Sequence, residues 1–174
     1  VPQSPAQETA TPAVASPSEQ EKAISKVLDD WHAAAGAADE ERYFGLMTED
    51  SVFLGTDATE RWDKKAFRAY SHPHFARGKA WRFHAVRRAI VLSPAGDSAW
   101  FDEDLGTEKL GPARGSGALV KQPDGWRITL YNLSVPIPND RFDDVRKLIA
   151  GEAAPAPAPP PAPAPAPAPP PKPQ

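Results

Sequence analysis

The hydrophobic pattern of the chain changes its period once, and this change constrains the fold more than any other feature. Up to residue 77, apolar side chains recur at helical spacing. From residue 81 onward, short apolar or alternating runs are separated by turn sequences such as SPAGD and QPDG, which is typical of strands. Helices that come first and strands that come last predict an α+β fold with an antiparallel sheet.

Three helices are expected in the first part. A capping box, Ser18-Glu19-Gln20-Glu21, marks the start of the first helix, which Gly36 ends. Asp39 is expected to cap the second helix and Asp63 the third, because a carboxylate accepts hydrogen bonds from free N–H groups of the first turn. Between them we expect a short strand at 51–54 and a polar loop at 55–62.

The second part predicts four strands, at 81–92, 99–105, 115–121 and 126–135, and then a short final helix at 141–150. Short turns between four antiparallel strands give a strongly twisted, curved sheet. Three helices packed on the inner face of such a sheet would enclose a cone-shaped cavity.

The ends of the chain differ in composition from the middle. Residues 1–17 are rich in Pro, Ala, Ser, Thr and Gln and are expected to be disordered. Residues 152–174 are almost entirely Pro and Ala, which fits neither helix nor sheet and favours polyproline II. This tail is either an inert low-complexity segment or a stiff spacer. The folded unit is therefore expected at 18–151.

Composition also excludes several classes of function. A net charge of −3 argues against a nucleic-acid partner, which would need a basic face. The absence of cysteine excludes disulfides, thiol catalysis and thiolate metal sites. No apolar run approaches the roughly 20 residues of a transmembrane helix. Because the chain begins with Val1, we expect a protein exported to the periplasm or secreted after removal of a signal peptide.

Four stretches, YFGLMTEDSVFLGTDATERW, AWFDEDL, RGSGALVK and GWRITLYNLSVPIPND, make residues 20–140 resemble the SnoaL-like domains of the nuclear transport factor 2-like superfamily. The resemblance implies a cone-shaped fold, a partly apolar pocket between helices and sheet, and a homodimer formed through the sheet. The superfamily includes polyketide cyclases, ketosteroid isomerases, dehydratases, epoxide hydrolases and binding modules. No residue set here matches the catalytic set of a characterised enzyme branch.

The acidic stretch SAWFDEDLG (98–106) supplies the main candidate for catalysis. Since alternate residues of a strand share a face, Glu103 is expected to point into the cavity with Phe101 and Leu105. Symmetric turns would place Glu103, Ser116 and Tyr131 in one polar row across three strands. A slip of one residue would turn part of this row to the other face.

Two interpretations of this row stay open. Glu103, with a pKa raised by desolvation, would act as a general acid or base beside the Tyr131 hydroxyl, which would stabilise an oxyanion. Alternatively, Glu103 belongs to a structural hydrogen-bond network with an ion pair to Arg87 or Arg114. Val86 or Arg87 is expected to lie next to Glu103, depending on the preceding turn.

The loop at 55–62 supplies candidate ligand-binding residues. Arg61 would bind a carboxylate, Trp62 would pack on a ligand, and Asp57 lies beside them. The alternative is a capped loop in which Asp57 binds backbone amides and Trp62 fills the core. His72-Pro73-His74 is not expected to hold a metal, because Pro73 should push His72 out of helical geometry and no third ligand is evident. Nothing marks His32 or His84 as functional.

These observations favour a protein that binds a small apolar or carbonyl-containing molecule in the cone cavity, without a cofactor. One alternative is a cofactor-free isomerase, cyclase or lyase that uses Glu103. Another is an envelope protein-interaction module that uses the outer sheet face and the Pro-rich tail.

Overall fold

The computed structural model describes residues 18–151, which divide into two compact units after Pro136. The predictions made for residues 1–17 and 152–174 lie outside the described residues. Among residues 18–151, no helix is both long enough and apolar enough to cross a membrane.

The three predicted N-terminal helices are present and begin where the sequence places them. They are α1 (Glu19–Gly36), α2 (Glu40–Gly45) and α3 (Lys64–Ala76). The Ser18 hydroxyl accepts from the Glu21 amide at 3.2 Å and the Glu21 carboxylate accepts from the Ser18 amide, so the capping box is complete. Asp39 and Asp63 cap the other two helices through their carboxylates. Helix α3 continues through His72 and Pro73, so the expected break at His72 is wrong.

The sheet has six strands and is mixed, so the prediction of a purely antiparallel sheet is wrong. The strands are β1 (Met47–Leu54), β2 (Arg61–Asp63), β3 (Phe83–Leu92), β4 (Ser98–Thr107), β5 (Ala113–Gln122) and β6 (Gly125–Ser134). Their order in the sheet is β2-β1-β6-β5-β4-β3, and β1 and β6 pair in parallel. The expected polar loop also contains a short strand, β2, which pairs with β1. Turn sequences reveal neighbours along the chain but give no sign of a pairing between distant strands.

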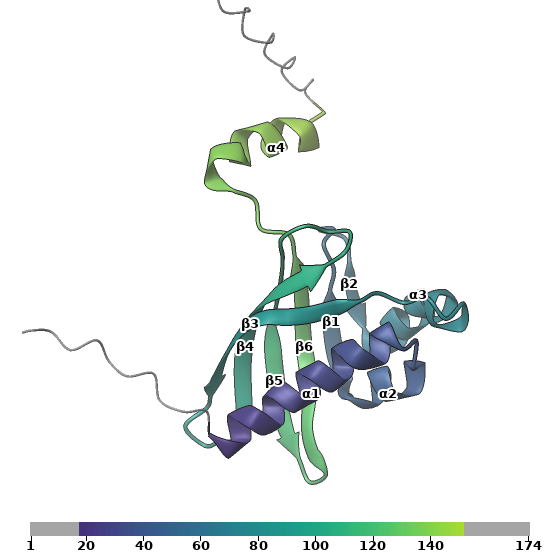
Figure 1. The fold of residues 1–174 in the computed structure, drawn as a ribbon, viewed down its shortest axis with the longest axis vertical. Helices are drawn as coiled ribbons and strands as arrows, with labels where there is room; N and C mark the ends of the chain where they lie inside the picture. Colours follow the sequence, from purple (N-terminus) through teal and green to yellow (C-terminus); the bar gives the residue numbers. More distant parts are fainter. Residues whose placement is uncertain (1–17, 152–174) are drawn as a thin grey trace, which may run out of the picture. The chain divides into compact units, whose positions relative to one another are not determined.

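Helix α1 runs across one face of the curved sheet, with α2 and α3 near one of its ends (Figure 1). The core lies between these helices and the inner sheet face. Its largest fully buried side chains are aromatic, among them Trp31 of α1, Tyr43 of α2, Phe67 of α3 and Tyr131 of β6. Burial of each such side chain contributes roughly 1.5–3 kcal/mol, so these rings hold the helices on the sheet.

The strand register corrects the predicted polar row. Glu103 pairs with Gly115, and Ser116 pairs with Asp102 on one side and Asn132 on the other. A shift between Ala118 and Leu119 displaces the β5–β6 register by one residue. Ser116 therefore lies on the opposite sheet face from Glu103, and the prediction that it completes a row with Glu103 and Tyr131 is wrong.

The unit that begins at Ile137 contains a 3-10 turn, η1 (Asn139–Arg141), and a fourth helix, α4 (Phe142–Ile149). The predicted final helix is thus present. Phe142, Leu148 and Ile149 are exposed on it.

Candidate functional site

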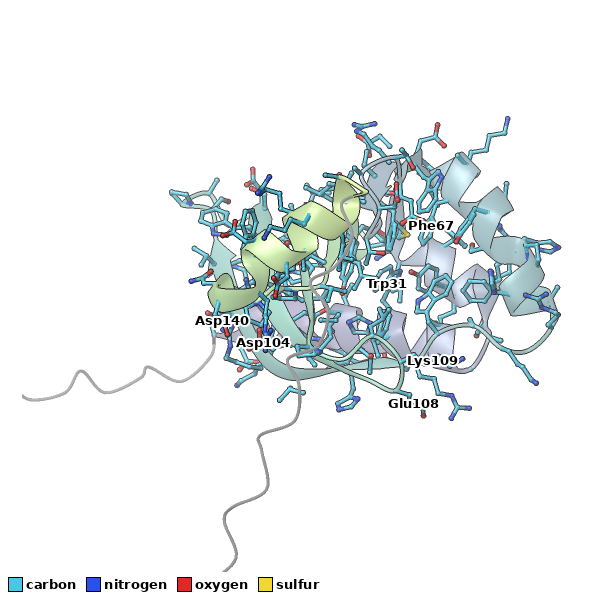
Figure 2. The ribbon with its side chains drawn as sticks, turned by 90° about the horizontal axis from the view of Figure 1, so that it is seen from above. Trp31, Phe67, Asp104, Glu108, Lys109 and Asp140 are labelled. Atoms are coloured by element: carbon cyan, nitrogen blue, oxygen red, sulfur yellow. The ribbon has the colours of Figure 1, made fainter. Side chains whose placement is uncertain are left out.

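A cavity of about 230 Å³ opens between the helices and the inner sheet face of the first unit. We call it the aromatic cavity, because eight of its lining residues are Phe, Tyr or Trp. Figure 2 labels two of them, Trp31 and Phe67, among the other side chains. The lining residues are Trp31, Phe53, Gly55, Thr56, Glu60, Trp62, Phe67, Tyr70, His74, Trp81, Phe83, Tyr131 and Leu133.

The β1–β2 hairpin and helix α3 build one wall of the aromatic cavity from stacked rings. Phe53 pairs with Trp62 across the hairpin. Their rings stack at 6.1 Å and 27°, and Phe53 stacks on Phe67 at 4.0 Å and 14°. Tyr70, one turn after Phe67, stacks on Trp62 at 4.6 Å. The wall is therefore aromatic and apolar, a surface suited to an apolar ligand.

The three candidates of the 55–62 loop take different positions. Trp62 is half-buried and lines the aromatic cavity, whereas Asp57 and Arg61 are exposed and do not. The Asp57 carboxylate accepts from the Thr59 amide at 2.8 Å and from its hydroxyl at 2.6 Å. These two bonds lower the pKa of Asp57. Asp57 therefore caps its own loop, as the alternative interpretation expected.

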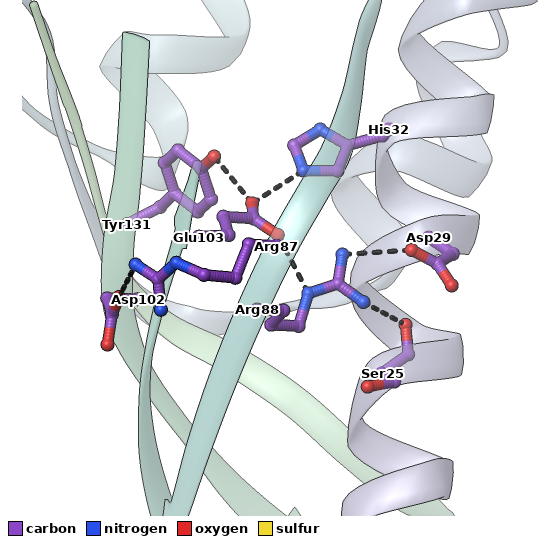
Figure 3. Close-up of polar contacts among 8 residues, drawn as sticks. All are labelled: Ser25, Asp29, His32, Arg87, Arg88, Asp102, Glu103 and Tyr131. Carbon is purple, nitrogen blue, oxygen red and sulfur yellow. Dashed lines mark hydrogen bonds and ion pairs between the residues drawn. The ribbon is translucent and has the colours of Figure 1, made fainter. Parts of the chain in front are cut away.

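Glu103 points inward, as predicted, and its side chain is 0% exposed. Figure 3 shows its three partners. One carboxylate oxygen, Oε1, accepts from the Tyr131 hydroxyl at 2.9 Å and lies 2.7 Å from His32 Nε2. The other oxygen, Oε2, accepts from Arg88 Nε at 2.8 Å. Both oxygens are thus bonded, and Glu103 does not line the aromatic cavity.

Arg88 is itself held by helix α1. Its Nη1 donates to the Ser25 carbonyl at 3.0 Å and its Nη2 to Asp29 at 2.9 Å, as Figure 3 shows. The guanidinium therefore joins β3, β4 and α1 through charge-assisted hydrogen bonds. The predicted Arg87 ion pair exists, but it joins Arg87 to Asp102 and Asp104 and not to Glu103.

The pKa of Glu103 lies below its ordinary value, so the expected rise is wrong. Burial does raise this pKa, but the hydrogen bond and charge of His32 and the charge of Arg88 lower it by more. Burial and the neighbouring Glu103 carboxylate both raise the pKa of Tyr131 well above its ordinary value. At neutral pH Glu103 is therefore a carboxylate, and the Tyr131 hydroxyl stays protonated and donates a hydrogen bond to it.

Sequence reasoning missed His32 and Arg88. The signal for His32 was its place four residues after Leu28 and eight after Ile24, on the apolar stripe of α1. A histidine on that stripe must be buried and needs a partner. For Arg88 no local signal existed, because a register shift between Ala85 and Arg87 moves Arg88 opposite Glu103.

The histidines of HPH have other partners. His72 Nδ1 lies 2.8 Å from a Glu40 carboxylate oxygen, and His74 Nδ1 lies 3.3 Å from Arg77 Nη2. Within residues 18–151 no group of three or more His, Asp or Glu side chains is placed to hold a metal ion.

Comparisons with known proteins agree with the fold. The family model of the SnoaL-like domain matches residues 24–138. A solved structure from Novosphingobium aromaticivorans, of a protein proposed to be an aromatic ring hydroxylase, is 21% identical with a TM-score of 0.59 and covers 71% of this chain and 94% of that one. No curated protein matches.

Two further solved structures share the fold. A nuclear transport factor 2-like protein of unknown function from Pseudomonas putida is 15% identical with a TM-score of 0.55, covering 67% of this chain and 87% of that one. A protein from N. aromaticivorans proposed to be a scytalone dehydratase is 14% identical with a TM-score of 0.56, covering 67% and 83%. These likenesses confirm the predicted nuclear transport factor 2-like fold.

Proposed function

Because the chain belongs to the SnoaL-like domain family, we propose that it binds a small, flat, largely apolar molecule in the aromatic cavity. The observation that carries this proposal is the stacked wall formed by Phe53, Trp62, Phe67 and Tyr70. Such a wall gains dispersion and stacking energy from a planar ligand, while the few polar groups of the lining, Thr56 and Glu60 among them, set its orientation.

Glu103 fits a structural role better than a catalytic one. All its bonds go to His32, Arg88 and Tyr131, and its low pKa leaves no proton to donate at neutral pH. A general base must also lie within hydrogen-bond reach of a bound substrate, and Glu103 does not line the aromatic cavity.

A second candidate function, proton transfer on a carbonyl-containing molecule, has one observation in its favour. Tyr131 both lines the aromatic cavity and donates to Glu103, so its side chain joins the cavity to the buried carboxylate. In an isomerase, cyclase or lyase of this kind, Glu103→Gln would abolish turnover. In a binding protein, a folded Glu103→Gln variant keeps its affinity. Turnover of a bound carbonyl compound therefore separates the two functions.

The third alternative, an interaction module, uses the outer sheet face and the Pro/Ala-rich tail; the tail lies outside the described residues, and this alternative stays a prediction. The homodimer through the sheet and export of the protein stay predictions.

The proposal is tested by titrating the protein with a neutral planar probe, 2-naphthamide, and recording the NMR signals of the indole N–H groups of the five tryptophans. Trp31, Trp62 and Trp81 line the aromatic cavity, and Trp100 and Trp126 do not. We expect the first three signals to shift on titration and the last two to stay. Equal shifts of all five, or none, would refute the proposed site.

A matched pair of variants sharpens this test. Trp62→Ala removes a ring from the cavity wall, whereas Trp100→Ala removes an exposed ring that does not line the aromatic cavity. A stacked aromatic pair contributes about 0.5–1.5 kcal/mol beyond its buried area. We therefore expect Trp62→Ala to weaken 2-naphthamide binding by roughly tenfold and Trp100→Ala to leave it unchanged.

A further inference from the structure

A second hollow, of about 460 Å³, borders the aromatic cavity. We call it the basic cleft, because three cationic side chains line it. The segment between α3 and β3 forms one side, and the β4–β5 loop, where Figure 2 labels Glu108 and Lys109, forms the other. The lining residues are Gly36, His74, Gly78, Lys79, Ala80, Trp81, Arg82, Phe83, Thr107, Glu108, Lys109 and Leu110.

The charges of the basic cleft are not balanced. Lys79, Arg82 and Lys109 take part in no ion pair within residues 18–151. Glu108 is the one carboxylate in the lining, so the cleft carries a net positive charge. This contrasts with the chain as a whole, whose net charge is −3. An anionic group therefore finds a favourable potential here.

The two hollows share a wall. His74, Trp81 and Phe83 line both of them. The aromatic cavity alone is smaller than the roughly 300–1,000 Å³ of typical small-molecule sites, whereas the two hollows together fall within this range. A ligand that spans the shared wall would place an apolar ring on the stacked aromatic wall and a charged group among the cations.

We propose that the ligand is an aromatic carboxylic acid, with its ring in the aromatic cavity and its carboxylate in the basic cleft beside Arg82 and Lys109. This inference rests on the proposed function and adds the charge of the ligand to it. Arg82 offers a planar pair of donors that matches the two oxygens of a carboxylate, and Lys79 and Lys109 add point charges at the rim.

The test compares two probes that differ in one group, 2-naphthoate and its neutral amide, 2-naphthamide. Their affinities are measured by calorimetric titration of the full chain at neutral pH and low salt. The double variant Arg82→Gln/Lys109→Gln removes two charges of the basic cleft. The control Lys65→Gln/Lys121→Gln removes two exposed charges that line neither hollow.

We expect the wild type to bind naphthoate at least roughly fivefold more tightly than naphthamide, which is a modest gain because the cations are exposed. The cleft variant should lose this preference through weaker naphthoate binding alone, and the control should keep it. Added salt should weaken only naphthoate binding.

Equal affinity for the two probes, or a preference that survives in the cleft variant, would overturn the inference and leave the aromatic cavity standing as a binding site. Failure of both probes to bind would overturn the proposed function, and the inference with it.

Discussion

Gly115→Ala is the sharpest perturbation of the Glu103 network. Gly115 lies opposite Glu103 on the inner sheet face, and the Tyr131 side chain reaches across it. A methyl group added there would overlap the Tyr131 hydroxyl oxygen and lie 2.8 Å from Cζ of that ring and 2.9 Å from Glu103 Oε1. Side-chain carbon atoms essentially never approach their neighbours below 3.0 Å. The added methyl group must therefore displace Tyr131, Glu103 or the strand.

The size of the destabilisation depends on how easily the neighbouring side chains can move. Tyr131 is 1% exposed and contacts Trp31 and Phe53, so its ring has little room. Overpacking of a core costs about 1–3 kcal/mol, and losing a hydrogen bond to a charged group costs about 1.5–3 kcal/mol. The two costs overlap, since movement of the ring also breaks the bond. We expect a loss of about 2–4 kcal/mol in the free energy of unfolding.

The assay is chemical denaturation at neutral pH, with Gly45→Ala as the control. Gly45 lies in α2 and has no atom within 4 Å of an added methyl group, so alanine there should stabilise by about 0.4–1 kcal/mol. A double-mutant cycle with Tyr131→Phe isolates the cause, because phenylalanine lacks the overlapping oxygen. In that background Gly115→Ala should cost clearly less.

Two results would refute this reasoning. One is a Gly115→Ala protein as stable as the wild type. The other is an equal cost of Gly115→Ala with and without the Tyr131 hydroxyl, which would place the strain elsewhere.

Three further predictions concern stability. Arg88→Met removes the arginine partner of the buried Glu103 carboxylate and should cost about 3–5 kcal/mol in urea unfolding, whereas Arg87→Met on the exposed sheet face should cost far less. Because the folded-state pKa of Glu103 lies below its ordinary value of 4.5, the stability it contributes is present above about pH 4.5 and lost as the pH falls through the folded-state pKa. Urea unfolding between about pH 6 and pH 3 should therefore show a steeper loss for the wild type than for Glu103→Gln. Ser18→Ala removes the α1 cap and should lower the free energy of unfolding by about 1 kcal/mol, measured by the same method.

Local features of the fold could be predicted from the sequence. The caps at Ser18, Asp39 and Asp63 depend on neighbouring residues only, and all three form as expected. The inward direction of Glu103 follows from strand alternation beside Phe101, which is also buried.

The register could not be predicted, and the reason is specific. The tight turn after β5 does pair Gln122 with Gly125, but beyond the shift near Ala118 every pair on β5 and β6 moves by one residue. The β4–β5 register differs from the symmetric expectation by one residue in the opposite sense. Across the three strands the two errors add to a shift of two residues, so Leu133 and not Tyr131 lies in the row of Glu103. A shift of two keeps Tyr131 on the inner face, from where its hydroxyl still reaches Glu103, whereas Ser116 is shifted by one and changes face.

Contacts between distant segments also could not be predicted from the sequence. His32 and Glu103 come into contact because helix α1 packs over the inner face of the sheet. No residue pattern in α1 or in β4 indicates this contact. Trp62 was predicted either to pack on a ligand or to fill the core, and it lines the aromatic cavity. Its neighbour Arg61 is exposed and does not line the cavity, because alternate residues of a strand face opposite ways. Two residues that are adjacent in a strand therefore do not share a binding role.

The parallel pairing of β1 with β6 has a consequence for how the protein is made. Strand β6 lies between β1 and β5 in the sheet and is the last strand within residues 18–151. While the ribosome is still translating the middle of the chain, β1 and β2 have no other strand to join, and Phe53 has yet to meet Tyr131. The β1–β6 pair closes the long chain segment between Leu54 and Gly125, and contacts between residues so distant in sequence form slowly. The nascent chain must therefore keep its aromatic N-terminal half from aggregating until residue 134 has emerged.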